Sequence, residues 1–247
     1  MRSKSILKTV VLSMLIAIGV VISPILRVEG MCPMAHFINI VCSVFMGPWY
    51  SLLCAFIIGI IRMTIMGIPP LALTGAIFGA FLSGVFYRFS KGKLIFAVLG
   101  EIIGTGIIGA IVSYPVMSLI WGKDGISLLF YVPSFICGTL IGGSIAFFFL
   151  RKYADIGMLT KTQDMLGSKV YADKSSILSN TILIATFGAI MFFVFFMVPQ
   201  VFKVEGAIWG YLAYGSIAVF LVLALIYFVV RKIKEKNNQR DGSLIEK

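Results

Sequence analysis

His36 and Asn39 are the pair whose residue types and spacing best suit ligand binding in this chain. His36 is the only histidine, and it lies in the run Pro33-Met34-Ala35-His36-Phe37-Ile38-Asn39 at the start of an apolar segment. Residues three apart share one face of a helix, and a neutral imidazole and a carboxamide both donate and accept hydrogen bonds. We therefore expect the pair to bind a small heteroaromatic ligand with a ring nitrogen and a hydroxyl. The alternative is that both side chains only cap the helix and brace the loop before it.

Glu101 is a second candidate, because it lies in the apolar run Leu99-Gly100-Glu101-Ile102-Ile103-Gly104-Thr105-Gly106. A carboxylate at membrane depth is costly unless it is paired or hydrated. It either makes a structural hydrogen bond, for example with Thr105, or acts as a ligand contact or conformational latch. The glycines resemble a phosphate loop only superficially, since no Gly-Lys-Ser/Thr ending follows.

Arg62, Tyr114 and Tyr131 complete the candidate substrate-binding residues. All three are expected near the outer ends of helices. The two tyrosines could wall a pocket by stacking, although an aromatic belt at the membrane interface is the simpler explanation for most such residues. Arg62 is either a charge that snorkels to the interface or a partner of a lid over the pocket.

The sequence offers no arrangement for catalysis, a metal or a cofactor. It contains no HExxH, no Walker A motif and no paired aspartates, and Cys32, Cys42, Cys54 and Cys137 lack CxxC spacing. With a single histidine, the cysteines are expected to be buried free thiols rather than zinc ligands. A membrane enzyme built on His36 and Glu101 would need the two to meet. We expect them apart, with Glu101 in the inner third of its helix and His36 near the outer face.

The composition predicts an all-α membrane protein. Of 247 residues, 60% are hydrophobic and only 13% charged, and mean hydropathy is +1.03, whereas soluble domains carry about 25% charged residues. The net charge of +11 does not indicate nucleic acid, because the basic clusters flank apolar segments that meet a lipid bilayer, as the positive-inside rule expects.

Eight helices are predicted, at about 6–23, 36–47, 48–65, 71–88, 94–121, 126–150, 176–198 and 206–231. All but four of the 21 basic residues then fall on one side, which predicts a multi-pass protein with both termini in the cytoplasm. We expect a six-helix unit (1–155), a polar cytoplasmic linker (156–175), an accessory two-helix transmembrane hairpin (176–231) and a disordered charged tail (232–247).

The segment 36–47 is too short for a full span of about 20 residues, so it is either re-entrant or leans on neighbouring helices. The loop before it, 23–35, should then fold over the outer mouth of the bundle. Loop and short helix together are expected to form the lid and wall of an outward-facing pocket.

Pairs of small residues four apart recur along the chain, and such pairs let helix backbones approach closely in lipid. The pairs Gly75/Gly79, Gly100/Gly104 and Gly138/Gly142 are expected to pack inside the bundle. Ser13 and Ala17 in the first helix differ, because their face could equally dock another membrane protein.

Several motifs resemble the ThiW family, the substrate-binding (S) components of energy-coupling factor (ECF) transporters. They are the His36 run, Gly47-Pro48-Trp49-Tyr50, Gly100-Glu101-Ile102-Ile103-Gly104-Thr105-Gly106, Ser113-Tyr114-Pro115 and Phe130-Tyr131-Val132-Pro133-Ser134-Phe135. The resemblance covers about 5–155 and leaves out the last third. It implies a six-helix S component that binds hydroxyethylthiazole, the thiazole precursor of thiamine.

The resemblance also implies partners: a transmembrane coupling protein and two cytoplasmic ATPases. Small residues on the first helix of S components contact the coupling protein, which matches Ser13 and Ala17. The ligand generally lies under the outer loop, which matches His36, Asn39, Tyr114 and Tyr131. An S component for another vitamin, such as thiamine, and a scaffold subunit without a small ligand are the alternatives.

Overall fold

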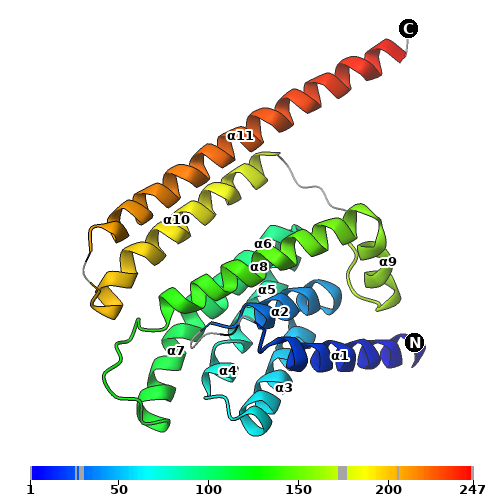
Figure 1. Cartoon of the computed structure of the whole chain (residues 1–247). Helices are drawn as coiled ribbons and strands as arrows, with labels where there is room; N and C mark the ends of the chain where they lie inside the picture. Colours follow the sequence, from blue (N-terminus) through cyan, green and yellow to red (C-terminus); the bar gives the residue numbers. More distant parts are fainter. Residues whose placement is uncertain (1, 26, 28–30, 172–176, 205, 246–247) are drawn as a thin grey trace. The chain divides into compact units, whose positions relative to one another are not determined.

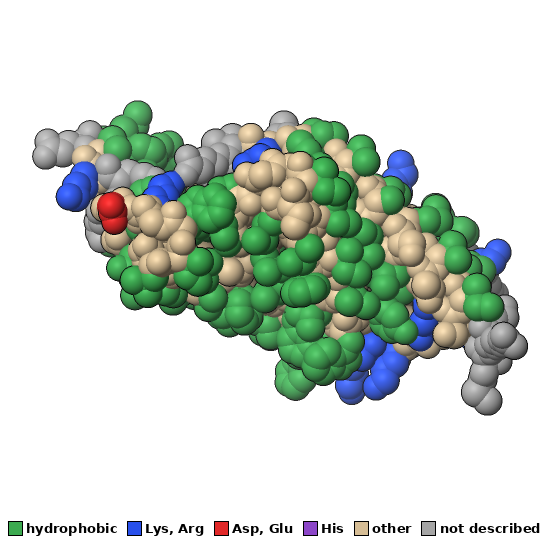
Figure 2. Space-filling view, turned by 90° about the horizontal axis from the view of Figure 1, so that it is seen from below, with side chains coloured by type: hydrophobic (Ala, Val, Ile, Leu, Met, Phe, Trp, Pro, Cys, Tyr) green, Lys and Arg blue, Asp and Glu red, His purple; other side chains and the backbone are tan. Residues whose placement is uncertain are grey.

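The chain is an all-α membrane protein, and its computed structural model describes residues 2–25, 27, 31–171, 177–204 and 206–245 (Figure 1). It divides into two compact units, Met1–Asp173 and Lys174–Lys247. Within the described residues, seven helices are long and apolar enough to cross a membrane. On the face seen in Figure 2, hydrophobic side chains predominate and the basic side chains lie mainly toward the edges, as expected for a surface in contact with lipid.

The helical segments of the first unit follow one another along the chain, with the longer connections between α1 and α2 and between η2 and α8. They are α1 (Arg2–Ile22), α2 (Pro33–Met46), α3 (Pro48–Met66), α4 (Leu71–Thr74), α5 (Ile77–Phe89), α6 (Leu94–Glu101), the π-helical η1 (Ile102–Gly109), α7 (Ala110–Pro115), the π-helical η2 (Val116–Ile120), α8 (Val132–Asp155) and α9 (Met158–Met165).

Two predicted helices differ from the structure. The segment predicted at 71–88 is interrupted at Gly75 and Ala76, which separate α4 from α5. The helix predicted from 126 begins only at Val132, because Gly122 and Gly125 adopt positive φ angles of 74° and Pro133 suits a first helical turn. The helix predicted at 94–121 is confirmed as one continuous run from α6 to η2.

The short helix α2 lies at the centre of the first unit. It has 14 residues, about 21 Å at 1.5 Å per residue, which is less than the roughly 30 Å of a bilayer's hydrocarbon core. Eleven of its residues are buried, and it contacts α1, α3, α5, α6, α8 and α9. Its neighbours therefore shield a helix that is too short to span alone.

Glycines make this close packing possible. A Cβ on Gly104 of η1 would lie 2.6 Å from Gly79 Cα in α5, and a Cβ on Gly142 of α8 would overlap the Pro33 carbonyl at the start of α2. Gly75 and Gly138 are likewise in tight contact with Phe135 and Met31. The expectation that these pairs pack inside the bundle is confirmed.

Helix α9 lies in the segment predicted to be a linker, yet it packs with the bundle. Gln163 is fully buried, and its Nε2 donates to the Val44 carbonyl (2.9 Å) and to the Tyr87 hydroxyl (3.0 Å). Val44 belongs to the last turn of α2, where carbonyls lack partners within the helix. Leu159 and Leu166 are buried beside it, so residues 156–173 group with the first unit.

We expect a chain ended after Asp173 to fold, whereas a chain ended after residue 158 should be less stable by at least about 2 kcal/mol. The shorter chain loses Gln163 and two buried leucines, and each buried leucine contributes about 1.5–3 kcal/mol. Thermal unfolding of both purified chains in detergent measures the difference. Equal melting temperatures would show that α9 does not stabilise the bundle.

The second unit is a hairpin of α10 (Ile177–Phe202) and α11 (Ile208–Ile245). Asn180 Nδ2 donates to the Tyr227 hydroxyl at 2.9 Å, and Gly188 packs against Phe220. The expectation of a disordered tail is wrong, because α11 continues to Ile245. Lys, Arg, Glu and Gln residues after 231 have good helix propensity, so the charged end extends the preceding helix.

Candidate functional site

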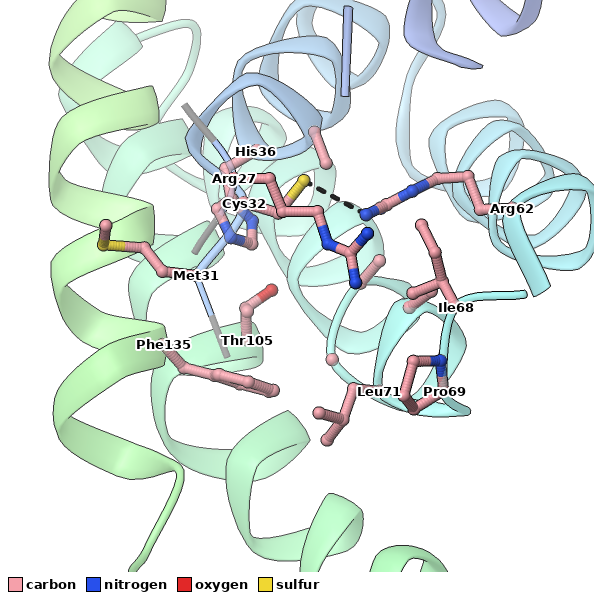
Figure 3. Close-up of a pocket in the computed structure, with 14 residues that line it drawn as sticks. Arg27, Met31, Cys32, His36, Arg62, Ile68, Pro69, Leu71, Thr105 and Phe135 are labelled. Atoms are coloured by element: carbon pink, nitrogen blue, oxygen red, sulfur yellow. Dashed lines mark hydrogen bonds between the residues drawn. The ribbon is translucent and has the colours of Figure 1, made fainter. Parts of the chain in front are cut away.

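The first unit contains a pocket of about 70 Å³, enough for several water molecules at roughly 10–15 Å³ each. Its walls come from the segment before α2, from α2, α3, α4, η1 and α8, and from the connections on either side of α4 (Figure 3). The lining residues are Arg27, Met31, Cys32, Ala35, His36, Arg62, Ile68, Pro69, Leu71, Ala72, Gly75, Ala76, Thr105 and Phe135. Residues of the predicted lid and of the predicted short helix therefore share one pocket.

Behind His36 and Thr105 in the pocket lining, Glu101 is the centre of a buried polar cluster. Its Oε1 accepts hydrogen bonds from His36 Nδ1 (2.9 Å), Asn39 Nδ2 (2.9 Å) and Thr105 Oγ1 (3.2 Å). Asn39 Nδ2 also lies 3.4 Å from the carbonyl of Ala76. Glu101 is 0% exposed, and its Oε2 has no hydrogen-bond partner among the described residues. The structural hydrogen bond between Glu101 and Thr105 is therefore present, and a ligand contact or latch role would come in addition to it.

His36 and Glu101 are in contact, so the expectation that they lie apart is wrong. Because α2 is short, its first turn begins inside the bundle and not at the outer surface. Pro33 is buried there, and Gly142 of α8 leaves room for it. His36 therefore lies at the depth of Glu101. The contact also removes the geometric objection to a membrane enzyme that uses this pair.

Arg62 reaches into the pocket from α3 (Figure 3). Its side chain is almost fully buried, at 3% exposure, so it does not snorkel. One Nη donates to Cys32 Sγ at 3.3 Å, and that thiol lies 3.0 Å from the Ser23 carbonyl. Arg62 thus holds the segment before α2, as the lid alternative expected, while its Nε has no partner among the described residues.

The two tyrosines lie outside the pocket lining. Tyr131 is buried at 1% exposure and packs against Phe135, with ring centroids 5.7 Å apart, so it backs a pocket residue. Tyr114 is half-buried in α7. The structure therefore places His36 and Arg62 in the pocket lining and Asn39 and Glu101 behind His36, but it leaves both tyrosines outside the lining.

Arg27, Cys32 and Phe135 line the pocket but were not predicted from the sequence as pocket residues. Cys32 was considered only as a possible zinc ligand or free thiol, and no local pattern marks Arg27. The feature that could have marked Arg27 is its position, because it is one of four basic residues on the predicted outer side. Phe135 lay in a recognised motif but was not singled out.

Ser13 and Ala17 are exposed on α1, whereas Leu12, Leu15 and Gly19 face the bundle. Ser13 Oγ donates to the Thr9 carbonyl of its own helix. The two small residues are therefore not used in packing α1 against the described part of its unit. Their face is available to lipid or to another membrane protein.

The family model for the thiamine-precursor transporter protein ThiW matches residues 9–156. This match covers more than half of the chain. The chain belongs to the ThiW family. No curated protein and no solved structure matches the chain. The membrane helices fit a ThiW transporter, and the matched range includes every residue of the pocket and of the buried cluster.

The ThiW match ends in the connection between α8 and α9. Helix α9 and the hairpin α10–α11 therefore lie beyond the part of the chain that the family model describes. Within the ThiW region, the described residues contain no cluster of three or more His, Cys, Asp or Glu side chains with metal-site geometry.

Proposed function

We propose that the chain is the substrate-capture S component of an ECF-type transporter that takes up hydroxyethylthiazole. The observation that carries the proposal is the buried cluster of His36, Asn39 and Glu101 directly behind a pocket, in a chain of the ThiW family. Arg27, Met31 and Cys32, which line this pocket, would belong to its lid. Partner ATPases would drive uptake, since the sequence has no nucleotide-binding motif.

The cluster would prepare His36 for a ligand. Glu101 would accept a hydrogen bond from a protonated Nδ1 of His36. In a neutral ring, Nε2 would then carry no proton and could accept a hydrogen bond from the ligand's hydroxyl. Asn39 and Glu101 would act from behind the wall by fixing this geometry, as supporting hydrogen bonds do in binding sites. Phe135, backed by Tyr131, would stack on the thiazole ring. Tyr114 remains proposed as an outer contact.

The same contact between His36 and Glu101 would orient a general base in an enzyme. Covalent catalysis also needs a nucleophile within hydrogen-bond reach of the other ring nitrogen. Among the described residues, no hydroxyl or thiol hydrogen-bonds to His36, and the nearby Cys32 thiol is directed to the Ser23 carbonyl instead. We therefore assign the pair to binding and propose that the protein is not an enzyme.

Partner docking is proposed for the exposed small face of α1. With both termini in the cytoplasm, Ser13 and Ala17 would meet the transmembrane coupling protein within the bilayer, where small residues allow close helix approach. The two cytoplasmic ATPases would act through that coupling protein. The proposal needs no nucleic acid, no metal and no cofactor bound to this chain.

We expect Ala17→Trp to reduce ATP-dependent uptake of hydroxyethylthiazole at least about tenfold in vesicles containing the coupling protein and ATPases, because an indole prevents close helix approach. Binding to the isolated chain should be unchanged. Ser144→Trp, at another small exposed position in a spanning helix, is the matched control and should preserve uptake. Full uptake by the Ala17 variant would place the docking face elsewhere.

The choice of ligand distinguishes the proposed function from two alternatives, an S component for another vitamin and a scaffold subunit. A thermal-shift panel of hydroxyethylthiazole, thiamine and the pyrimidine precursor on the purified chain should show the largest stabilisation by the thiazole, since a ligand stabilises the state that binds it. Stabilisation only by thiamine would indicate an S component for another vitamin. Stabilisation by none would favour a scaffold subunit.

A further inference from the structure

The pocket contains two arginines and no acidic residue in its described lining. Arg27 comes from the segment before α2 and Arg62 from α3, and both guanidinium groups point into the pocket (Figure 3). No carboxylate of the described residues lies within 4 Å of either guanidinium. Among the described residues, Glu101 lies behind the pocket-lining His36 and Thr105, and its Oε1 accepts hydrogen bonds from His36, Asn39 and Thr105.

Arg62 is the unusual member of this pair, because its charge is buried with no ion-pair partner among the described residues. It is 3% exposed. Among the described residues, its Nε has no partner and its hydrogen bond goes to the Cys32 sulfur. Sulfur is a weak acceptor, and a guanidinium carries five donors in a planar fork. A buried charge is normally paired, and no described residue of the pocket supplies a counter-ion for this group.

We propose that the ligand of this pocket carries an anionic group, a carboxylate or a phosphate monoester, which binds between Arg62 and Arg27. An arginine fork matches the oxygens of either group in a bidentate geometry. The rest of the lining is mainly apolar, and Leu71 and Phe135 lie on the side away from the guanidiniums (Figure 3). The ligand class is therefore a small apolar or aromatic ring with one acidic substituent.

This inference rests on the proposed function, because it narrows the substrate of the same site. In the thiazole series it favours an acidic derivative over the neutral alcohol. The anion would also bridge α3 to the segment before α2, since Arg62 and Arg27 belong to these two elements.

Calorimetric titration of the purified full chain tests the inference with three matched probes: hydroxyethylthiazole, its phosphate monoester, and the thiazole acetate that replaces the alcohol with a carboxylate. We expect at least one anion to bind about tenfold or more tightly than the alcohol, a difference of about 1.4 kcal/mol. The tighter of the two anions identifies the acidic group. Equal affinities for all three probes would overturn the inference.

Variants of Arg62 and Arg27 test whether these two side chains cause the preference for an anion. Arg62→Met should bring the anion-to-alcohol ratio close to one, and Arg62→Lys, which keeps the charge but loses the fork, should keep part of it. Arg27→Gln changes an exposed side chain, so it should preserve the fold even if Arg62→Met does not, and it should also lower the ratio. An unchanged ratio in Arg27→Gln and in every folded Arg62 variant would overturn the inference.

A benzene pair separates this inference from the proposed function. Phenylacetate and 2-phenylethanol carry the same acidic and neutral substituents without a thiazole. Preference for phenylacetate with no binding of any thiazole would support the anion site and contradict the proposed substrate. Binding of hydroxyethylthiazole without any preference for anions would do the reverse.

Discussion

Replacing Glu101 with alanine is expected to destabilise the first unit by about 3 kcal/mol or more and to abolish ligand binding. The carboxylate oxygen Oε1 accepts from His36, Asn39 and Thr105 at 2.9–3.2 Å. Each buried donor left without an acceptor costs about 1–3 kcal/mol, and Glu101 is 0% exposed. Without its partner, His36 also loses the orientation that we propose for binding.

Two controls grade this effect. Thr105→Val removes only the longest of the three bonds and keeps the side-chain shape, so it should cost about 1 kcal/mol. Glu101→Gln retains one acceptor oxygen and should fall between the other two variants. Thermal unfolding in detergent and calorimetric titration report stability and binding on the same samples. If Glu101→Ala melts like the unmodified chain and still binds, the cluster has neither role.

Replacing Gly104 with valine should strongly disrupt the packing of η1 against α5. A Cβ there would lie 2.6 Å from Gly79 Cα and 2.6 Å from the Phe78 carbonyl oxygen. Both are backbone atoms of α5, so a clash can be relieved only by moving the helix. Overpacking typically costs about 1–3 kcal/mol, and we expect the upper end of this range or more, with loss of the folded peak in size-exclusion chromatography.

Gly106→Ala is the matched control two residues away. Its Cβ would meet Ile136 Cγ1 at 2.7 Å, which is a side-chain atom that can move. Gly104→Ala should therefore lower the melting temperature more than Gly106→Ala, although both add one methyl group to the same π-helical segment. The opposite order would mean that α5 and η1 are not packed backbone to backbone.

Much of the first unit could be predicted from the sequence, because apolar runs and their stops are local signals. Gly47 and Pro48 separate α2 from α3 as expected, with Gly47 at a φ of 95°. The shortness of α2 was also visible, and the structure answers the question it raised. The helix leans on its neighbours, since it contacts six other helices of the unit.

The meeting of His36 and Glu101 could not be predicted from a topology diagram. Such a diagram assigns depth by counting residues from the membrane surface, whereas α2 starts inside the bundle beside Gly142. The role of α9 was missed for a similar reason. Its polar sequence reads as a linker, yet Gln163 is polar because it satisfies the Val44 carbonyl at the end of α2.

The role of Arg62 could not be predicted from its residue type alone. A basic residue near a helix end is compatible with snorkelling or with a lid contact, and the sequence does not separate them. The distinction came from its 3% exposure and its hydrogen bond to Cys32, both of which depend on how the segment before α2 folds back. Long-range contacts of this kind carry no local pattern.

The central claim is that this ThiW family member captures a thiazole precursor in the pocket beside His36. Its most direct test is titration of hydroxyethylthiazole into the purified full chain and into His36→Ala. We predict saturable one-to-one binding that the variant weakens about tenfold or more, since loss of a hydrogen bond to a buried partner costs about 1–3 kcal/mol. No binding of any thiazole probe by the unmodified chain, or equal affinity in a folded His36→Ala variant, would contradict the account.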